Sequence, residues 1–396
     1  MSDRLIHTGG GATIHVTPLG KDQAYITAAI EDRADARQAT GDAYGKVAEV
    51  LADRGLQIVH ERVFGSPDAH PAIVAMRADA LGRRGIPADS PVTYIHGCPL
   101  WGEGLAGVNL LATRARESGD VWTVMDESGR PCGRGWRCHG ATFLILQNLH
   151  GRNAHSTDDN SQVAQTGRMF DRADRILRSQ QANYTHVTRT WVYLADILDW
   201  YDEFNEVRNA KYDGFGLMPQ SGDGSSDKVL LPASTGIAGA APTGAAATMD
   251  LLATIPDAGS PVEVRLLSNR KQRDAFKYGS AFSRGACICL PDATWISISG
   301  TAAIDERGNS LHPEDTRGQI RRTVENVRSL IAPEGAGLTD LCDTTVFLKR
   351  PEDAPIYREM AAELGLDKIP AVCVVADICR DELLFEVDAA AVVVRE

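Results

Sequence analysis

A threefold internal repeat constrains the fold of this chain more than any other feature of its sequence. Three segments of the 396-residue chain share one order of elements: helix, strand, helix, strand, turn and strand. Such a unit carries helices on one face of its sheet and can bury the other face against its neighbours. We therefore predict an α+β fold of three tandem units, each a mixed β-sheet with two helices, arranged as a pseudo-trimer within one chain.

The three units are expected at residues 1–115, 116–256 and 262–396. Apolar periodicity and runs of β-branched and aromatic residues predict the elements inside each unit. The helices are expected at residues 41–52, 72–81, 169–179, 197–210, 316–330 and 354–364. The strands are expected at residues 60–64, 91–95, 107–112, 189–194, 230–234, 246–252, 344–348, 371–376 and 383–389.

The second and third units are also expected to open with a pair of strands. These pairs are predicted at 121–126 with 141–146 and at 286–290 with 295–300, whereas the first unit, which opens at 9–16, looks abridged. Polar stretches at 153–165 and 221–227 predict surface loops.

Composition narrows the class of protein. The net charge is −12 and the basic residues are scattered, which argues against a nucleic-acid-binding surface. No apolar run reaches the roughly 18 residues of a membrane-spanning helix. The first residues lack the apolar core of a signal peptide, and eight cysteines without such a signal indicate reduced thiols in the cytoplasm. Cys132, Cys138 and His139 fit no common zinc spacing, so we expect no metal site.

The closing strand of the third unit carries a titratable residue that the other two units lack. Aligning the three closing strands places Glu386 beside Thr248 and Gly107. A carboxylate within an apolar strand holds its proton more tightly than in water unless it finds a partner. A pseudo-trimer with one active site would leave such an asymmetry. The alternatives are a Glu386 side chain that points to solvent by strand alternation, and simple drift of a structural repeat.

Other candidate site residues lie near this strand. Arg380 could bind a substrate carboxylate through two hydrogen bonds, or pair with Asp377 or Asp381 at the surface. Cys379 could act as a nucleophile only if its thiol pKa were depressed, and a residue that shapes a pocket is the preferred interpretation.

Two loops complete the set of candidates. The stretch from Tyr278 to Gly285 places a Tyr and Arg284 around glycines and is typical of a loop that approaches a ligand, although a turn with an exposed Arg would look the same. The stretch Gly300, Thr301 and Ala302 ends a predicted strand and offers backbone N–H groups to an anion.

The repeated unit resembles the Rid family of imine deaminases, which are homotrimers with sites between subunits. The resemblance rests on units that close on Pro-Ala-x and on Ser299-Gly300-Thr301 after the opening strand pair. In that family an Arg binds the substrate carboxylate where this chain has Val372 in its third unit and Ser234 in its second. This departure argues against imine deamination.

From about residue 169 to its end the chain also resembles the chorismatases, single-chain relatives of that fold which cleave pyruvate from chorismate. The similarity rests on the segments 189–194, 200–208, 231–237, 278–284, 299–304, 376–380 and 383–386. It implies that Glu386 is the general acid and that Cys379 occupies a pocket position that helps to decide the product. It also implies that Arg284 and Arg380 bind the carboxylates of the substrate, beside Tyr278 and the 300–302 loop.

The resemblance therefore predicts a cytoplasmic enzyme that needs no cofactor and no metal, and that acts as a monomer or a weak homo-oligomer. Its substrate would be a small carboxylated molecule such as chorismate. Its products would be pyruvate and a dihydroxycyclohexadienoate or a hydroxybenzoate. Two other interpretations stay open: a Rid-fold enzyme acting on another small carboxylated substrate, and a pseudo-trimer that binds metabolites without catalysis.

Overall fold

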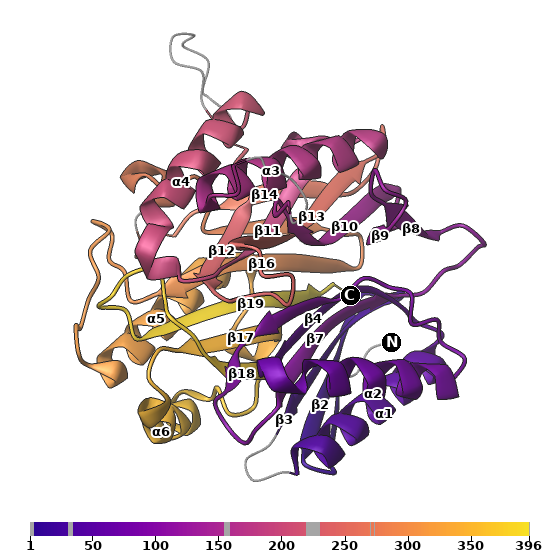
Figure 1. The fold of residues 1–396 in the computed structure, drawn as a ribbon, viewed down its shortest axis with the longest axis horizontal. Helices are drawn as coiled ribbons and strands as arrows, with labels where there is room; N and C mark the ends of the chain where they lie inside the picture. Colours follow the sequence, from indigo (N-terminus) through magenta and orange to yellow (C-terminus); the bar gives the residue numbers. More distant parts are fainter. Residues whose placement is uncertain are drawn as a thin grey trace.

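Three mixed β-sheets, each covered on its outer side by two long helices, make up the protein (Figure 1). The computed structural model describes residues 4–30, 35–153, 159–218, 230–269, 271–272 and 274–395, and the side chains of residues 277 and 278 are outside this description. The predicted loop at 221–227 therefore lies outside the described residues. Because each sheet has its helices on one side, the three remaining sheet faces meet at the centre of the molecule.

The first sheet has the strand order β1-β2-β3-β7-β4-β5. Its strands are β1 (Leu5–Gly9), β2 (Ala12–Leu19), β3 (Gln23–Ile30), β4 (Gln57–Gly65), β5 (Thr93–His96) and β7 (Leu105–Thr113). Its helices are α1 (Ala36–Arg54) and α2 (His70–Arg83).

The second sheet has the order β12-β11-β13-β10-β9-β8. Its strands are β8 (Val121–Met125), β9 (Pro131–Cys138), β10 (Ala141–His150), β11 (Val187–Leu194), β12 (Ala233–Ala238) and β13 (Ala247–Pro256). Its helices are α3 (Gln162–Ser179) and α4 (Ile197–Gly214).

The third sheet has the order β14-β15-β16-β19-β17-β18-β6. Its strands are β14 (Glu263–Leu267), β15 (Gly285–Cys289), β16 (Ala293–Ala302), β17 (Leu341–Leu348), β18 (Ala371–Val375) and β19 (Phe385–Val394), and β6 (Cys98–Pro99) of the first unit adds a seventh strand at its edge. Its helices are α5 (Thr316–Ile331) and α6 (Ala354–Leu364).

The strand orders confirm the predicted threefold repeat. Six strands occur in the same order in every sheet, and each sheet contains one parallel pair, β4 with β5, β11 with β12 or β17 with β18. Local signals define several helix ends. Asp315 caps the first turn of α5, Ser161 caps that of α3, and Gly365 ends α6 in the left-handed conformation that favours glycine.

Some sequence predictions about the elements were wrong. The first unit is not abridged, because β1, β2 and β3 form a complete three-stranded opening. In the second unit β9 lies between the two strands that were expected to pair with each other. Residues 131–138 are rich in Gly and Arg, so the sequence did not indicate this strand. Helix α3 begins at Gln162, inside the stretch predicted as a loop, and β12 begins at Ala233 rather than at residue 230.

Apolar side chains from all three units form the core between the sheets. Aromatic rings make the contacts across the unit boundaries: Tyr25 of the first unit packs edge-on against Trp295 of the third at 6.0 Å between ring centroids. Phe64 of the first unit contacts Tyr193 of the second and Phe347 of the third at 6.1 and 6.4 Å. The units are therefore joined by a shared core rather than by surface contacts.

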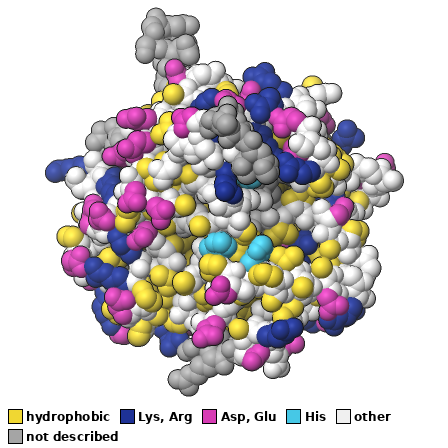
Figure 2. Space-filling model, viewed as in Figure 1, with side chains coloured by type: hydrophobic (Ala, Val, Ile, Leu, Met, Phe, Trp, Pro, Cys, Tyr) yellow, Lys and Arg dark blue, Asp and Glu magenta, His cyan; other side chains and the backbone are white. Residues whose placement is uncertain are grey.

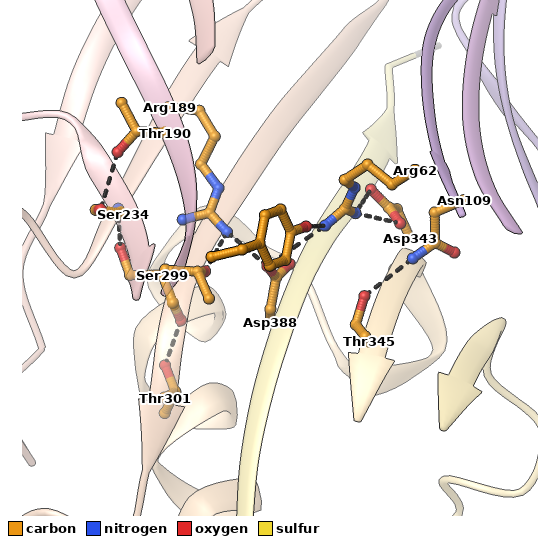
Figure 3. Close-up of polar contacts among 12 residues, drawn as sticks. Arg62, Asn109, Arg189, Thr190, Ser234, Ser299, Thr301, Asp343, Thr345 and Asp388 are labelled. Atoms are coloured by element: carbon orange, nitrogen blue, oxygen red, sulfur yellow. Dashed lines mark hydrogen bonds and ion pairs between the residues drawn. The ribbon is translucent and has the colours of Figure 1, made fainter. Parts of the chain in front are cut away.

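Charged side chains lie at the centre of this core (Figure 3). The guanidinium of Arg62 lies 2.8 Å from the Asp343 carboxylate and 3.5 Å from that of Asp388, and Arg189 lies 3.1 Å from Asp388. All four side chains are almost completely buried. Two cations and two anions from three different units thus neutralise each other where water is excluded.

The strand register places Asn109, Asp250 and Asp388 at equivalent positions of the three closing strands. Arg62 pairs with Asn109, Trp191 with Asp250, and Thr345 with Asp388. The closing strands therefore align as the sequence predicted, with Asn109, Asp250 and Asp388 in the same place. Each of the three reaches a neighbouring unit: Asn109 donates to Thr345, Asp250 contacts His60 at 2.9 Å, and Asp388 contacts Arg189.

We predict that Arg62→Met lowers the free energy of unfolding by about 3–5 kcal/mol, because Asp343 and Asp388 would be left buried without their shared cation. Urea denaturation followed by circular dichroism measures this change. Arg83→Met is the matched control: Arg83 pairs with Asp79 at the surface, where both side chains are more than half exposed, and its loss should leave the midpoint unchanged. Equal midpoints for both variants would contradict the central role of Arg62.

Candidate active site

A cavity of about 140 Å³ lies at the boundary between the second and third units and contains Glu386. The second unit contributes residues of α4 and β12, and the third contributes residues of β16, β19 and three loops. The lining residues are Tyr201, Asp202, Asn205, Ser234, Gly236, Ser280, Phe282, Arg284, Gly300, Ile304, Cys379, Arg380 and Glu386. All of these residues come from the second and third units of the chain.

Strand alternation in β19 directs Glu386 toward the centre of the molecule. Phe385 and Val387 pack in the core beneath α5 and α6, so Glu386 and Asp388 face the other way. Glu386 is 4% exposed, which contradicts the interpretation that its side chain points to solvent.

An irregularity in β16 makes room for this carboxyl group. The register between β16 and β19 shifts between Ile298 and Thr301, which is a β-bulge that contains Gly300. A Cβ atom at Gly300 would overlap Oε1 of Glu386, so the glycine allows the backbone to approach the carboxyl group closely. The bulge also positions Ser299, whose hydroxyl donates to the Ser283 carbonyl at 2.6 Å and accepts from the Ser234 amide at 2.9 Å.

The pKa of Glu386 is raised to about 8, first by burial and then by the negative charge of Asp388, while Arg284 and Arg189 act to lower it. A carboxyl group with this pKa keeps its proton at neutral pH. It can therefore donate that proton to a substrate, which an ordinary surface glutamate cannot do.

Arg284 supplies positive charge to the same cavity. It is 1% exposed and its guanidinium lies 5.3 Å from the ring centroid of Phe282. The alternative of a turn with an exposed Arg is therefore wrong. An acid that keeps its proton and a buried guanidinium thus line one small cavity, an arrangement suited to an anionic substrate that must be protonated.

The other two predicted residues of the 376–384 loop have different environments. Burial, together with the charge of Glu386, raises the pKa of the Cys379 thiol to about 12, so a thiolate nucleophile is disfavoured and a pocket-shaping role is supported. Arg380 lines the cavity and donates to the Gly308 carbonyl at 3.0 Å and to the Ser310 hydroxyl at 3.1 Å.

The carboxylates proposed as surface partners of Arg380 lie near another cation. Asp377 and Asp381 are 3.7 and 3.6 Å from the ammonium group of Lys349.

The remaining predicted site residues are Thr301, Ala302 and Tyr278. Thr301 and Ala302 are buried in β16, outside the lining of the cavity, and the Thr301 hydroxyl donates to the Ser299 carbonyl. Tyr278 ends a short 3₁₀ helix (Ala275–Tyr278), and its side chain lies outside the description.

Sequence reasoning assigned no role to three residues of α4 that line the cavity: Tyr201, Asp202 and Asn205. They belong to the segment 200–208 that carried the family resemblance, which was the available signal. Their position opposite Glu386 depends on how the second unit packs against the third.

The described residues contain no cluster of three His, Cys, Asp or Glu side chains placed to bind a metal ion. Within the same residues, none of the helices combines the length and the apolar composition needed to cross a membrane. Figure 2 shows charges of both signs scattered over one face of the molecule.

The strand register corrects one detail of the comparison with imine deaminases. Trp191 pairs with Thr235 in the same way that Thr345 pairs with Val372, so Thr235 and not Ser234 occupies the position of the family's carboxylate-binding Arg. In the first unit this position is Thr93. None of the three residues is an arginine.

The fold and the interface site define a Rid-like protein whose three units lie in one chain. Residues 275–393 match the family described as endoribonuclease L-PSP. Over 97 residues, 24% of this chain, the sequence is 26% identical to a 3-aminoacrylate deaminase of Acinetobacter baylyi, covering 77% of that protein.

The similarity to chorismatases extends much further along the chain. A 3-hydroxybenzoate synthase of Streptomyces hygroscopicus is 24% identical over 312 residues, which cover 71% of this chain and 83% of that protein. A crystal structure of a chorismatase has the same fold, with a TM-score of 0.59 and 20% identity over 85% of this chain and 93% of that one. The protein is therefore chorismatase-like over most of its length, and its third unit is similar to the Rid family, both at distant homology.

We predict that Asp388→Asn lowers the pKa of Glu386, because it removes the neighbouring negative charge and leaves Arg189 less compensated. A ¹³C NMR titration of the glutamate carboxyl carbons, assigned with Glu386→Gln, measures the shift. Asp250→Asn is the matched control, since Asp250 occupies the equivalent position of the second unit and contacts His60. A Glu386 pKa that is unchanged in Asp388→Asn would contradict this electrostatic account.

Proposed function

We propose that this protein is a chorismatase-type enzyme that cleaves the enolpyruvyl ether of chorismate, or of a close analogue, and releases pyruvate. The observation that carries the proposal is the buried Glu386 carboxyl group, which holds its proton to about pH 8 inside a cavity that also contains Arg284. The distant similarity to a 3-hydroxybenzoate synthase and to a chorismatase supports the same assignment.

The reaction begins with transfer of the Glu386 proton to the terminal carbon of the enol ether. The carbon that bears the ether oxygen then becomes an oxocarbenium ion. Water attacks this ion to form a hemiketal and loses a proton, and the C–O bond between the former enol-ether carbon and the ring oxygen then breaks. Hydrolysis gives pyruvate and a dihydroxycyclohexadienoate. Attack by a ring hydroxyl group of the substrate forms a cyclic ketal instead. The bond between the ring and the attacking oxygen then breaks, as does the bond between the ketal carbon and the other ring oxygen, and loss of a ring proton gives pyruvate and an aromatic hydroxybenzoate. A proton released in these steps returns to Glu386.

The charges that line the cavity suit this sequence of steps. Arg284 and Arg380 provide positive charge for the two carboxylates of the substrate. The carboxylate that Glu386 becomes after proton transfer lies close enough to the cation of Arg284 for Arg284 to lower its pKa, which stabilises the ionised state of the acid.

The direct test is to incubate the purified protein with chorismate and to couple pyruvate release to NADH oxidation by lactate dehydrogenase. NADH consumption above that of a heat-inactivated sample is expected. Its absence would refute the assignment to chorismate, and a panel of other enolpyruvyl ethers would then test the broader class of substrate.

Glu386→Gln should lower turnover by about 10²–10⁴-fold, because the amide preserves the shape of the side chain and cannot donate the proton. The same coupled assay measures the effect. Glu382→Gln is the matched control: Glu382 is exposed and is absent from the cavity lining, so its turnover should stay close to that of the wild type. Near wild-type turnover of a folded Glu386→Gln variant would exclude the proposed role.

Cys379→Ala should retain most of the pyruvate release and change the ratio of the ring products, because the residue shapes the cavity beside the acid. Chromatography of the reaction mixture separates a dihydroxycyclohexadienoate from a hydroxybenzoate. Loss of pyruvate release in this variant, or a covalent intermediate on sulfur, would assign the chemistry to the thiol instead.

A further inference from the structure

A second cleft lies where the third unit meets the first. Its volume is about 330 Å³, more than twice that of the Glu386 cavity. Strands β2 and β3 and the loop after β6 line it from the first unit, and α6 and β18 line it from the third. The residues that matter for its chemistry are Thr13, His15, Trp101, Tyr357, Arg358 and Cys373.

The strand register identifies this cleft as the pseudo-threefold counterpart of the Glu386 cavity. Ile298 of β16 pairs with Ala389, the residue after Asp388, and Ile26 of β3 pairs with Leu110, the residue after Asn109. These two isoleucines are therefore equivalent, because Asp388 and Asn109 are equivalent.

The residues that pair with these two isoleucines on the neighbouring strands show that lining residues of the two cavities are also equivalent. Ile298 pairs with Gly285 and Ile26 with Val16, so the preceding residues, Arg284 and His15, occupy equivalent positions. Two residues earlier, Phe282 corresponds to Thr13. On the opposite wall, Gly236 pairs with Val192 as Cys373 pairs with Val346, and a tyrosine lies close to each of them.

The second cleft lacks the group that would make it catalytic. The position of Glu386 is taken by Gly107, where a Cβ atom would overlap the Val372 side chain and the Ala28 carbonyl. Burial lowers the pKa of His15 and raises that of Cys373 to about 12, so both side chains are neutral near pH 7. The cleft therefore occupies the position equivalent to the Glu386 cavity but has no acid that corresponds to Glu386.

The cleft is lined by two aromatic rings and one cation instead of an acid that corresponds to Glu386. The rings of Trp101 and Tyr357 are 6.3 Å apart between centroids and inclined by 28°, and the Arg358 guanidinium lies 4.5 Å from the Trp101 ring centroid. Among the described residues of the lining, Asp367 supplies the one carboxylate. Flat π surfaces favour a planar aromatic ring, one guanidinium favours one carboxylate, and Asp367 disfavours a second.

We propose that this cleft, built by Trp101, Tyr357 and Arg358 at the boundary of the third and first units, binds a small planar aromatic monocarboxylate without transforming it. The proposal goes beyond the proposed reaction and does not depend on it. It concerns a different unit boundary and a different class of ligand from the dicarboxylate assigned to the Glu386 cavity.

Isothermal titration calorimetry with benzoate and 3-hydroxybenzoate tests the proposal on the full-length protein. Binding should weaken by about tenfold or more in Trp101→Leu and in Arg358→Gln, which corresponds to about 1.4 kcal/mol. It should change by less than about twofold in Arg284→Gln, which alters the other cavity. Cyclohexanecarboxylate, which has the same charge and a non-planar ring, should bind at least about tenfold more weakly than benzoate.

The variants also distinguish the two cavities. Arg358 is exposed, so Arg358→Gln is a test that does not rely on the folding of the Trp101 variant. Benzoate binding that is lost in Arg284→Gln and retained in Trp101→Leu would assign the ligand to the Glu386 cavity and overturn the proposal. Absence of measurable heat at millimolar benzoate would overturn it as well.

Discussion

The ion pairs at the centre of the molecule hold its three units in register. Arg62, Asp343, Asp388 and Arg189 come from three sheets, and none of them would be stable in this core without its partners from the other units. Apolar packing between the sheets drives their association, but the hydrophobic effect is not directional. The ion pairs are directional, because a displacement of one unit by a few ångströms would leave a buried ion unpaired. The charged centre thus specifies one arrangement of the three units.

The same buried ion pairs also affect the pKa of Glu386 at the boundary of the second and third units. Asp388 belongs to the ion-pair network and lies two residues from Glu386 on the same face of β19, so its charge raises the pKa of the acid. Arg189, its partner across the boundary, acts in the opposite direction. The ionisation of one carboxyl group in a small cavity therefore depends on contacts between units, and the scaffold and the site share residues.

Pseudo-threefold repetition allows equivalent positions at different unit boundaries to have different properties. At equivalent positions of the closing strands the chain has Gly107, Thr248 and Glu386, and only the last can titrate. The position held by Gly236 and Cys373 is taken in the first unit by Tyr94, whose buried ring contacts His70 and His96. One scaffold thus carries an acid at one boundary and an aromatic cleft at another.

The sequence by itself determined the repeat, most helices and strands, and the singular position of Glu386, because these depend on local periodicity and on comparison between units. Helix α6 was predicted with its observed bounds, and the closing strands were aligned as the strand register places them. Strand β9 was missed because its glycines and arginines weaken the periodic signal. The opening of the first unit was predicted as abridged because only residues 9–16 were recognised, whereas β2 and β3 each have eight residues. Only the tertiary structure decided what surrounds Glu386. The burial of its carboxyl group, the Gly300 bulge beneath it, the burial of Arg284 and the approach of Tyr201 and Asn205 from another unit arise from contacts between residues far apart in the chain. The pairing of Arg62 with Asp343 was likewise outside the reach of the sequence, because nothing local to either residue indicates that the first and third units meet at that point.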